Sequence, residues 1–379
     1  MKIAILGTRG IPNNYGGFEQ ITEQLSAGLV ARGHDVTVYN SHNHPNQQKT
    51  WNGVAIQHCF DPEYLIGTAG QFLYDLNCIR HARKNKYHVW LFMGYTSSSV
   101  WHLLFPKDTV VISNMDGMEW CRAKYTRPVQ RFLKQAEKLA VQHSQFHIAD
   151  SPAMKDYLEE EYGINVHYIP YGATLPCHQK ASVLQQYSIL KNDYHLLMAR
   201  MEPENNIEMI LDGFHNTGSE KRFLVIGKYD NKFGKHLLNK YRKDERVQFL
   251  GGIFDQEVVH SLRANTSIYF HGHSVGGTNP SLLEAMASGA LIAAHDNIFN
   301  KTILGKEAFY FTDTSEVKAL IEAEPCRQTK IAFSEKNREK IRLHYNWEAV
   351  VERYEELIVH SYKTGKHEHC IPSKRYAYK

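Results

Sequence analysis

The sequence has few cysteines for its 379 residues, and its histidines form no metal-binding pattern. The six cysteines include no CxxC pair, so neither a disulfide framework nor a cysteine-rich zinc site is predicted, and we expect free thiols. The 22 histidines include no cluster at metal-ligand spacing. We therefore expect neither a bound metal nor a cofactor.

Long apolar runs and a strong charge bias are also missing. The first apolar run, Ile3 to Leu6, is shorter than the roughly 7 to 15 residues of a signal-peptide core. No stretch approaches the roughly 18 apolar residues of a membrane span, so we expect a cytoplasmic protein. The formal net charge of +4 is too small to favour nucleic acid, but it suits anionic ligands or an anionic membrane surface.

Apolar stretches of strand length alternate with stretches of helical periodicity along most of the chain. At the start, KIAIL precedes a glycine-bearing loop, and Phe18, Ile21, Leu25 and Leu29 then follow at helical spacing before the strand-like HDVTVYN. A strand, a helix and a strand within about 40 residues form a βαβ unit, which requires a parallel sheet.

This alternation predicts two doubly wound α/β domains that face each other across a cleft. The first covers residues 1–173, and the second covers residues 174–345 and begins with the linker-like TLPCHQKAS. Residues 346–379 supply a final helix, at about 347–362, and a polar tail. Strands are expected at residues 2–6, 34–40, 88–94, 109–115, 146–150, 195–200, 222–227, 246–251, 267–272 and 290–295. Further helices are expected near residues 69–85, 126–143, 153–161, 206–215, 231–241, 255–264 and 280–288.

The stretch HGHSVGGTNPSLLEAMASG combines a bare loop with a strong helix start. Asn279 caps helices well, and Pro280 fits the first turn because its missing N–H would have no partner there. The free N–H groups of that turn and the helix dipole favour an anion, and Gly276 and Gly277 let a phosphate or sugar approach the backbone. The residues predicted to bind this ligand are His271, Gly276, Gly277, Thr278, Asn279, Ser281 and Glu284.

Glu284 lies just over one turn inside this helix, and helical side chains lean toward the N-terminus. Its carboxylate would repel a phosphate, so a sugar hydroxyl is its natural partner. The stretch therefore fits a nucleoside diphosphate, with the anion at the helix tip and the ribose at Glu284. The alternative is that Glu284 only complements the helix dipole.

The stretch FHGHSVGGTNPSLLEAMASGALIAA resembles the donor-binding signature of glycosyltransferase family 4, a family of retaining enzymes with the GT-B fold. RMEPENN, VIG and VQFLGGI lie where that family has its other motifs in this domain. GTRGIPNNYGGFEQ and NMDGMEWCRAKY are similar to bacterial rhamnosyltransferases that build surface polysaccharides. The resemblance implies a GT-B fold in which Glu284 holds the nucleoside ribose and Arg200 neutralises the diphosphate leaving group.

Two positions depart from the pattern of that family. Gly276 replaces a glutamate that usually precedes the second glutamate of the motif by eight residues, and Asn205 replaces a lysine. The first change removes a contact to the donor sugar and argues against common hexose donors. The second removes a positive charge, so Arg200, the helix tip and Lys228 or His271 must stabilise the leaving group. Neither change excludes transfer, because retaining GT-B enzymes are thought to use no side-chain nucleophile.

Glycines in GTRGIPNNYGGFEQ do not form the dinucleotide fingerprint GxGxxG, which argues against an oxidoreductase. We interpret Gly10, Gly16 and Gly17 as a flexible wall near the transferred sugar. The alternative is a long tight turn before a helix.

Two acidic residues, Asp116 and Glu119, follow a strand and are expected to point into the cleft from the first domain. Asp116 is the first choice for the base that deprotonates the acceptor hydroxyl. Its alternative role is to cap the turn at Gly117.

Four basic residues, Arg127, Arg131, Lys134 and Lys138, repeat at intervals that place them on one face of a helix. Such a face suits an anionic membrane leaflet that carries a lipid-linked acceptor. An ordinary solvated surface is equally compatible with the pattern.

These observations predict a metal-independent, retaining GT-B glycosyltransferase of two facing α/β domains. The resemblance implies dTDP-rhamnose as the donor and a lipid-linked saccharide as the acceptor, with possible peripheral membrane contact and no nucleic acid. The alternatives are a UDP- or GDP-hexose donor, and a non-catalytic subunit that binds nucleotide sugars.

Overall fold

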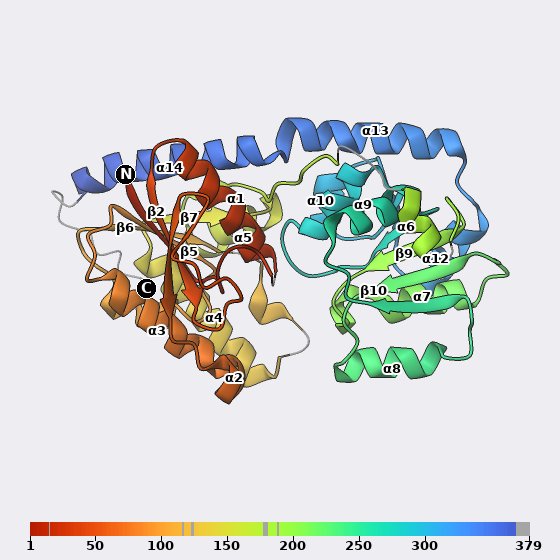
Figure 1. Ribbon diagram of the computed structural model, residues 1–379, viewed down its shortest axis with the longest axis horizontal. Helices are drawn as coiled ribbons and strands as arrows, with labels where there is room; N and C mark the ends of the chain where they lie inside the picture. The colour runs from red at the N-terminus through yellow and green to blue at the C-terminus, as the bar shows by residue number, and fades with distance from the viewer. Residues whose placement is uncertain (15, 116, 123–124, 177–180, 188, 369–379) are drawn as a thin grey trace.

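Two α/β domains lie side by side in the computed structural model, and the last two helices run along one side of both (Figure 1). The structure describes the chain except for residues 15, 116, 123–124, 177–180, 188 and 369–379. Each domain contains one sheet whose long strands are parallel, so the predicted pair of doubly wound domains is confirmed.

The first domain is built on a sheet of order β3-β4-β2-β1-β5-β6-β7-β8, in which β3 alone runs antiparallel to its neighbour. Strands such as β5 and β6 are buried along their whole length, because helices cover both faces of the sheet. The strands are β1 (Lys2–Leu6), β2 (Asp35–Ser41), β3 (Thr50–Trp51), β4 (Val54–Cys59), β5 (Val89–Met93), β6 (Val110–Asn114), β7 (Phe146–Ala149) and β8 (Val166–Tyr168).

Helices of the first domain follow the predicted amphipathic stretches. In α1, Ile21, Leu25 and Leu29 are buried at the spacing that the sequence shows. The helices are α1 (Gly17–Ala31), α2 (Glu63–Ile66), α3 (Gly70–Ala82), α4 (Arg127–His143) and α5 (Pro152–Tyr162), with the 3-10 helices η1 (Gly67–Ala69), η2 (Ser99–Leu104) and η3 (Glu119–Cys121).

The second domain has a parallel sheet of order β11-β10-β9-β12-β13-β14. Its strands are β9 (Tyr194–Met198), β10 (Arg222–Ile226), β11 (Val247–Gly251), β12 (Tyr269–His271), β13 (Ile292–His295) and β14 (Phe309–Phe311). Its helices are α6 (Ala181–Gln186), η4 (Pro203–Asn205), α7 (Ile207–His215), α8 (Lys232–Tyr241), α9 (Gln256–Asn265), α10 (Pro280–Ser288), α11 (Ile298–Leu304) and α12 (Thr314–Glu322). Because α6 begins at Ala181, the expected linker ends earlier than TLPCHQKAS suggests.

In each sheet, the strands that follow the first strand in sequence lie on both sides of it, so the strand order reverses there. In the first sheet β1 lies between β2 and β5, and in the second β9 lies between β10 and β12. Such switch points leave a crevice at the carboxyl ends of the strands, where ligands of doubly wound domains bind. In the second domain the loops that follow β9 and β12 meet at this point, where Asn206 donates to the carbonyl of Gly272 at 2.7 Å.

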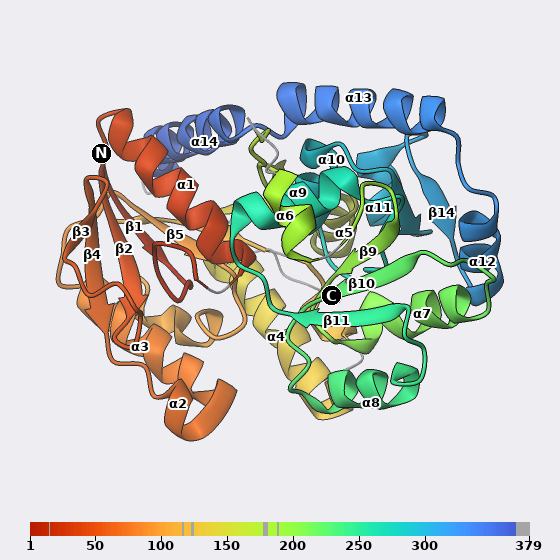
Figure 2. The same cartoon turned by 45° about the vertical axis from the view of Figure 1, so that its right-hand side comes forward.

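The last two helices connect the domains. Helix α13 (Arg327–His344) lies on the second domain, and Arg338 donates a hydrogen bond of 3.1 Å from Nε to the carbonyl of Ala287. Helix α14 (Trp347–Glu368) returns to the first domain and lies beside α1 in both views (Figures 1 and 2). There Glu355 pairs with Arg32 at 3.2 Å and with His34 at 2.8 Å. Since α14 continues to residue 368, the prediction that a polar tail follows residue 362 is wrong for residues 363–368.

The chain crosses between the domains twice, and the two crossings lie together. The backbone N–H of Ala173 donates to the carbonyl of Tyr345 at 2.7 Å. A Cβ atom on Gly172 would lie only 2.5 Å from the ring of Trp347, so a glycine is needed for this close approach.

Candidate active site

Helix α10 begins as its sequence predicts. The Asn279 side chain accepts a hydrogen bond of 2.9 Å from the N–H of Ser281, and Pro280 is the first helical residue. The start of α1 faces this turn, because a Cβ atom on Gly17 would lie 3.5 Å from Cγ of Pro280. The glycine-rich loop of the first domain therefore ends at the predicted anion-binding helix tip of the second.

Glu284 is held from both domains. One carboxylate oxygen is 2.7 Å from Nη1 of Arg263, on α9, and the other accepts a hydrogen bond of 3.0 Å from Gln20, on α1. Arg263 is only 2% exposed and also donates to the hydroxyl of Ser281 at 2.9 Å. The carboxylate is thus one half of a buried ion pair, in addition to any part it plays in ligand binding.

The glycine loop before α10 packs against the carboxyl ends of two strands of the first domain. A Cβ atom on Gly277 would lie 1.8 Å from the carboxylate of Asp150, just after β7, so only glycine permits this contact. The hydroxyl of Thr278 donates to the carbonyl of Asp150, and Gly117 lies against the backbone of Gly276. The domains are in direct contact at the predicted donor site.

Gly276 differs from its neighbour because its Cβ direction is open. No atom lies within 4 Å of that direction, but the backbone φ of +127° is one that only glycine adopts readily. A glutamate at this position would be strained. The glycine that replaces the glutamate of the resembling family is therefore the residue that this backbone conformation requires.

Two stacked histidines stand at the end of β12 and in the loop after it. The rings of His271 and His273 are 4.3 Å apart with an interplanar angle of 13°. Burial, with a smaller contribution from His273 and Arg263, lowers the pKa of His271 well below its ordinary value. Burial, followed by Arg200 and Arg122, lowers the pKa of His273 to about 3. Both imidazoles are therefore neutral at pH 7 and can each donate one hydrogen bond.

Neither ring nitrogen of the fully buried His271 has a hydrogen-bond partner among the residues that the structure describes. A buried polar atom without a partner is uncommon in native proteins, and a bound water or a ligand group is one way to satisfy it. His271 thus presents an N–H group at the switch point of the second sheet.

The predicted cations of the second domain are accessible. The Arg200 side chain, after β9, is 69% exposed and lies 4.0 Å from Glu202. Lys228, after β10, is also exposed, and its ammonium lies 5.4 Å from the centre of the Phe254 ring. Asn205 fills the position of the family's lysine and donates to the carbonyl of Arg200 at 2.7 Å, so it shapes the arginine loop without adding charge.

A buried carboxylate in the same loop was missed by the sequence analysis. Glu204 is 8% exposed, and within the described part of the chain neither of its carboxylate oxygens has a hydrogen-bond partner. Its carbonyl accepts hydrogen bonds from the N–H and the hydroxyl of Ser274, two residues before Gly276. The backbone of Glu204 therefore lies against the loop that leads to Gly276.

Residues expected to form the first-domain wall divide into two groups. Gly17 lies at the cleft, and Gly16 precedes it as the N-cap of α1. Gly10 is buried beneath Asn40 with a φ of +125°, and a Cβ atom there would lie 2.3 Å from that side chain. Asn40 hydrogen-bonds both the N–H and the carbonyl of Ile11, so the conformation of Gly10 serves the packing of its own loop.

The acidic residues after β6 have different outcomes. Asp116 lies outside the described residues. Glu119 lies in η3 and pairs with Arg122 at 2.5 Å, and Arg122 also lies 4.0 Å from Glu202 of the second domain. Glu119 is therefore part of a charged bridge across the cleft, which occupies one of its carboxylate oxygens.

The basic face of α4 is smaller than the sequence predicts. Arg127, Arg131 and Lys138 are exposed, but the ammonium of Lys134 lies over the rings of Trp120, Tyr157 and Tyr162 at 4.7 to 5.1 Å. It also pairs with the buried Glu137 at 3.1 Å. The prediction that Lys134 belongs to a solvated basic face is wrong, because its ammonium is paired with the buried Glu137 and lies over aromatic rings.

Besides Glu204, three further residues of this site were not identified from the sequence: Gln20, Asp150 and Arg263. Asp150 ends the strand-like FHIAD, so its place at a strand terminus was the available signal. Gln20 and Arg263 lie within helices and have no comparable local signal. Among the described residues, no group of three potential ligands is placed to hold a metal ion, and no helix is long and apolar enough to cross a membrane.

Comparison with known families separates the two halves of the chain. Residues 1–174 match a domain of unknown function, DUF1972, and residues 179–324 match the model of glycosyl transferases group 1. The second domain is a group 1 glycosyl transferase domain. No curated protein matches the chain in sequence.

Solved structures with the same fold include several proteins that match this glycosyl transferase domain together with the first domain. A sucrose-phosphate synthase from Thermosynechococcus elongatus superimposes with a TM-score of 0.80 at 17% identity, over 96% of this chain and 99% of its own. HepE from Anabaena, in complex with UDP-glucose, gives 0.74 at 13% identity, with coverages of 95% and 99%. A glycosyltransferase from Rickettsia africae gives 0.71 at 12% identity, with coverages of 96% and 98%. At these identities the likeness establishes the GT-B fold.

Proposed function

We propose that the protein is a retaining glycosyltransferase that transfers L-rhamnose from dTDP-rhamnose to a saccharide acceptor of surface polysaccharide synthesis. The main support is that Arg200, the two neutral histidines and the N-terminal end of α10 all follow the carboxyl ends of strands in the second sheet. A cation, neutral N–H donors and a helix tip are the groups that bind a diphosphate. Glu284 lies just over one turn behind that tip, and we assign it to the attached ribose.

The proposed chemistry relies on placing positive charge and on alignment. As the bond between the sugar and the diphosphate breaks, negative charge grows on the departing phosphate, and Arg200 and His271 stabilise it from fixed positions. The acceptor hydroxyl attacks from the same face, and its alignment is supplied by the first domain. Asp116 is the proposed base for that hydroxyl, and Glu119 is the second choice because Arg122 already pairs with it.

Recognition of ribose requires one exchange of partners. The Glu284 oxygen that accepts from Gln20 is the one that a ribose hydroxyl would bind, since the other is fixed by Arg263. The fixed oxygen holds the carboxylate at the correct rotamer while the free one changes partner. Lys228, Thr278 and Ser281 complete the proposed donor site.

The donor sugar is the finer part of the proposal. A 6-deoxy sugar has one hydroxyl fewer to satisfy, which suits a site without the family's carboxylate at position 276. Glu204 is the proposed partner for one of the remaining hydroxyls. The rival donor is a UDP-hexose, and it is favoured by one observation, namely that HepE shares this fold and is known in complex with UDP-glucose.

A donor panel tests these alternatives. We expect dTDP-rhamnose to raise the melting temperature more than dTDP alone and to give product with a lipid-linked saccharide acceptor. Product formed with UDP-glucose or GDP-mannose, but not with dTDP-rhamnose, would overturn the proposed donor. Binding without product from any donor would favour the non-catalytic subunit.

We also propose that the first domain contacts an anionic membrane surface. Eight of the thirteen exposed large hydrophobic side chains of the described residues belong to this domain, and they lie on or beside α2, α3, η2 and α4. These elements lie together at one end of the first domain (Figure 1). Arg127, Arg131 and Lys138 add positive charge to the same region, as interfacial binding requires. Sedimentation with anionic vesicles at low and high salt tests this contact, and no binding at low salt would exclude it.

A further inference from the structure

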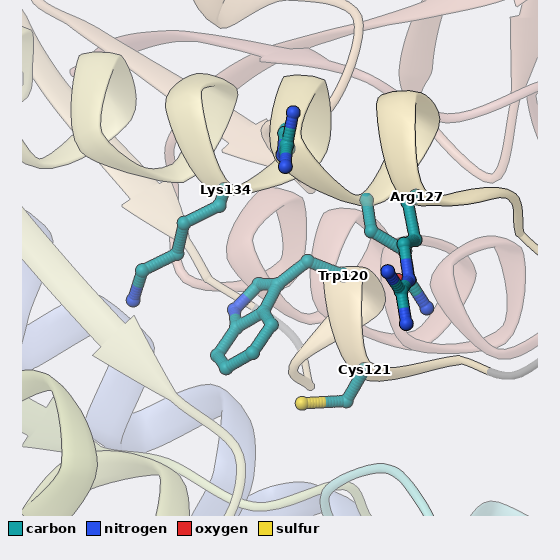
Figure 3. A pocket seen from close by; sticks show the side chains of 6 residues that line it. Trp120, Cys121, Arg127 and Lys134 are labelled. Carbon is teal, nitrogen blue, oxygen red and sulfur yellow. The ribbon is translucent and has the colours of Figure 1, made fainter.

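A pocket lies between η3 and the first turns of α4, outside the donor site. It has a volume of about 550 Å³ and is lined by Trp120, Cys121, Arg127, Gln130, Arg131 and Lys134. In Figure 3, Arg127 and Lys134 descend from α4 toward Trp120 and Cys121 of η3. The sequence analysis assigned these basic residues to an open helix face, but the structure gathers them around a concave site.

The charge of this pocket comes from two arginines. The ammonium of Lys134 is paired with Glu137 at 3.1 Å and with Glu161 at 3.1 Å, so its charge is already compensated. Within the described residues, neither Arg127 nor Arg131 has an ion pair or a hydrogen bond. The two guanidiniums are four residues apart on one helix and repel each other unless an anion lies between them. Their planar donor sets match phosphate oxygens.

The pocket lies beside a contact between the two domains. The next residue after η3 is Arg122, which reaches Glu202 of the second domain at 4.0 Å, and Gln130 of the pocket donates to the carbonyl of Arg122 at 3.2 Å. A ligand in the pocket would therefore lie next to the residue that joins the first domain to the β9 loop of the second. The same helix exposes Val129 and Phe132, which are 39% and 40% accessible, next to this charged site.

We propose that this pocket binds the diphosphate group of the acceptor, with the saccharide extending into the cleft and the lipid chain lying along the apolar side chains of α4. This inference rests on the proposed function, since it names the part of the acceptor that the first domain holds. It differs from a general attraction to anionic membranes because it assigns the contact to two arginines.

Cys121 provides a direct measurement, because this exposed thiol lines the pocket. The exposed Cys326, at the start of α13 on the other domain, serves as an internal control. The full-length protein is treated with N-ethylmaleimide, and the rate of modification at each thiol is followed by mass spectrometry of the peptides. We expect farnesyl diphosphate and inorganic pyrophosphate to slow modification of Cys121 and not of Cys326.

Matched variants separate a site from a charged surface. We expect the double variant Arg127→Gln/Arg131→Gln to raise the half-protecting concentration by at least about tenfold, since it removes both charged donors. Arg131→Gln alone, which lies beyond the first helical turn, is expected to show part of this effect without altering the helix start. Lys138→Gln, on the same helix face but outside the pocket, is expected to leave protection unchanged. Unprotected Cys121 in the wild-type protein, or equal losses in Lys138→Gln, would overturn the proposal.

The probes distinguish the sources of the phosphate group. Protection by farnesyl diphosphate at lower concentration than by pyrophosphate supports a lipid-linked diphosphate, whereas equal protection by both would overturn the lipid source. Protection by vesicles of phosphatidylcholine and phosphatidylglycerol that is weakened equally by Lys138→Gln and by Arg131→Gln, with no protection by farnesyl diphosphate, would indicate a headgroup surface and would also overturn it. A melting shift with dTDP reads the donor site separately. If dTDP causes no melting shift while Cys121 is still protected, the proposed function is rejected. If dTDP causes the shift while Cys121 is not protected, only the proposed diphosphate site in the pocket is rejected.

Discussion

The two sides of the cleft hold their charged side chains in different ways. On the second domain, the Arg200 side chain is 69% exposed with Glu202 at 4.0 Å, and the stacked rings of His271 and His273 carry no charge. On the first domain, Lys134 is enclosed by Glu137 and aromatic rings, and Glu119 is paired with Arg122. The proposed donor side thus keeps an exposed cation, whereas much of the proposed acceptor side is already neutralised by ion pairs. The difference explains why the proposed acceptor pocket depends on the few cations that remain unpaired.

Glu284 is the exception on the donor side, and its removal gives the largest expected effect. Glu284→Ala leaves Arg263 buried without its partner, so we expect the free energy of unfolding to fall by about 3 to 5 kcal/mol. The double variant Glu284→Ala/Arg263→Met is expected to recover part of that loss, as measured by urea denaturation. A double variant no more stable than Glu284→Ala would contradict the role of this ion pair.

Substitution of Arg200 tests whether an exposed cation on the proposed donor side is needed for activity, without a change in stability. Because its side chain is exposed, Arg200→Ala is expected to keep the melting temperature while kcat/KM falls by about 10² to 10³, or about 3 to 4 kcal/mol. Lys235→Ala, which removes an exposed cation of the same domain on α8, is the control and should keep full activity. Similar losses in both variants would mean that the net charge of the domain matters and not the position of Arg200.

The neutral histidines predict an acid-sensitive donor side. The pKa of His273 is about 3 in the folded chain and near 6.5 in the unfolded chain. Below pH 6.5 the unfolded chain therefore binds more protons than the folded chain, and the free energy of unfolding decreases as the pH is lowered. At pH 5 this loss is about 1 to 2 kcal/mol after allowance for partial exposure. We expect His273→Gln to reduce the stability difference between pH 8 and pH 5 by that amount, measured by urea denaturation at each pH. An unchanged difference would show that His273 titrates normally.

Two lysines of α4 give the smallest expected effects and test the neutralised side. Lys134→Gln removes one donor and the compensating charge from the buried Glu137, which keeps its bonds from Tyr157 and Tyr162, so we expect a loss of about 1 to 2 kcal/mol. Lys138→Gln, one turn further along, is expected to stay within about 0.5 kcal/mol. Thermal unfolding of both variants measures this difference in stability. Equal stabilities would mean that Lys134 lies on a solvated face, as the sequence predicts.

Local signals in the sequence predicted much of the fold. The start of α10 followed from Asn279 and Pro280, because a cap acts within one helical turn. The hairpin of β3 and β4 was missed although Asn52 and Gly53 form its turn with positive φ, which is the usual Asn-Gly signal. That omission was one of interpretation and not a lack of information.

The candidate site was less predictable, because its contacts join distant segments. Arg263 and Glu284 meet only because α9 and α10 pack together, and Gln20 reaches Glu284 from the other domain. Lys134 has the spacing of a solvent-facing residue, but α5 brings Tyr157 and Tyr162 against it. Periodicity specifies the face of a helix, and it cannot specify what another element places on that face.

The bond between Ala173 and Tyr345 has a mechanical consequence. Both connections between the domains therefore pass through this one corner. Any rotation of one domain against the other would turn about it and would have to break the contacts that Gln20, Arg122 and Asp150 make with the second domain. Tyr171 lies beside this corner, and Gly17 faces both Tyr171 and Pro280, so the start of α10 would move less than parts of the domain that lie further away.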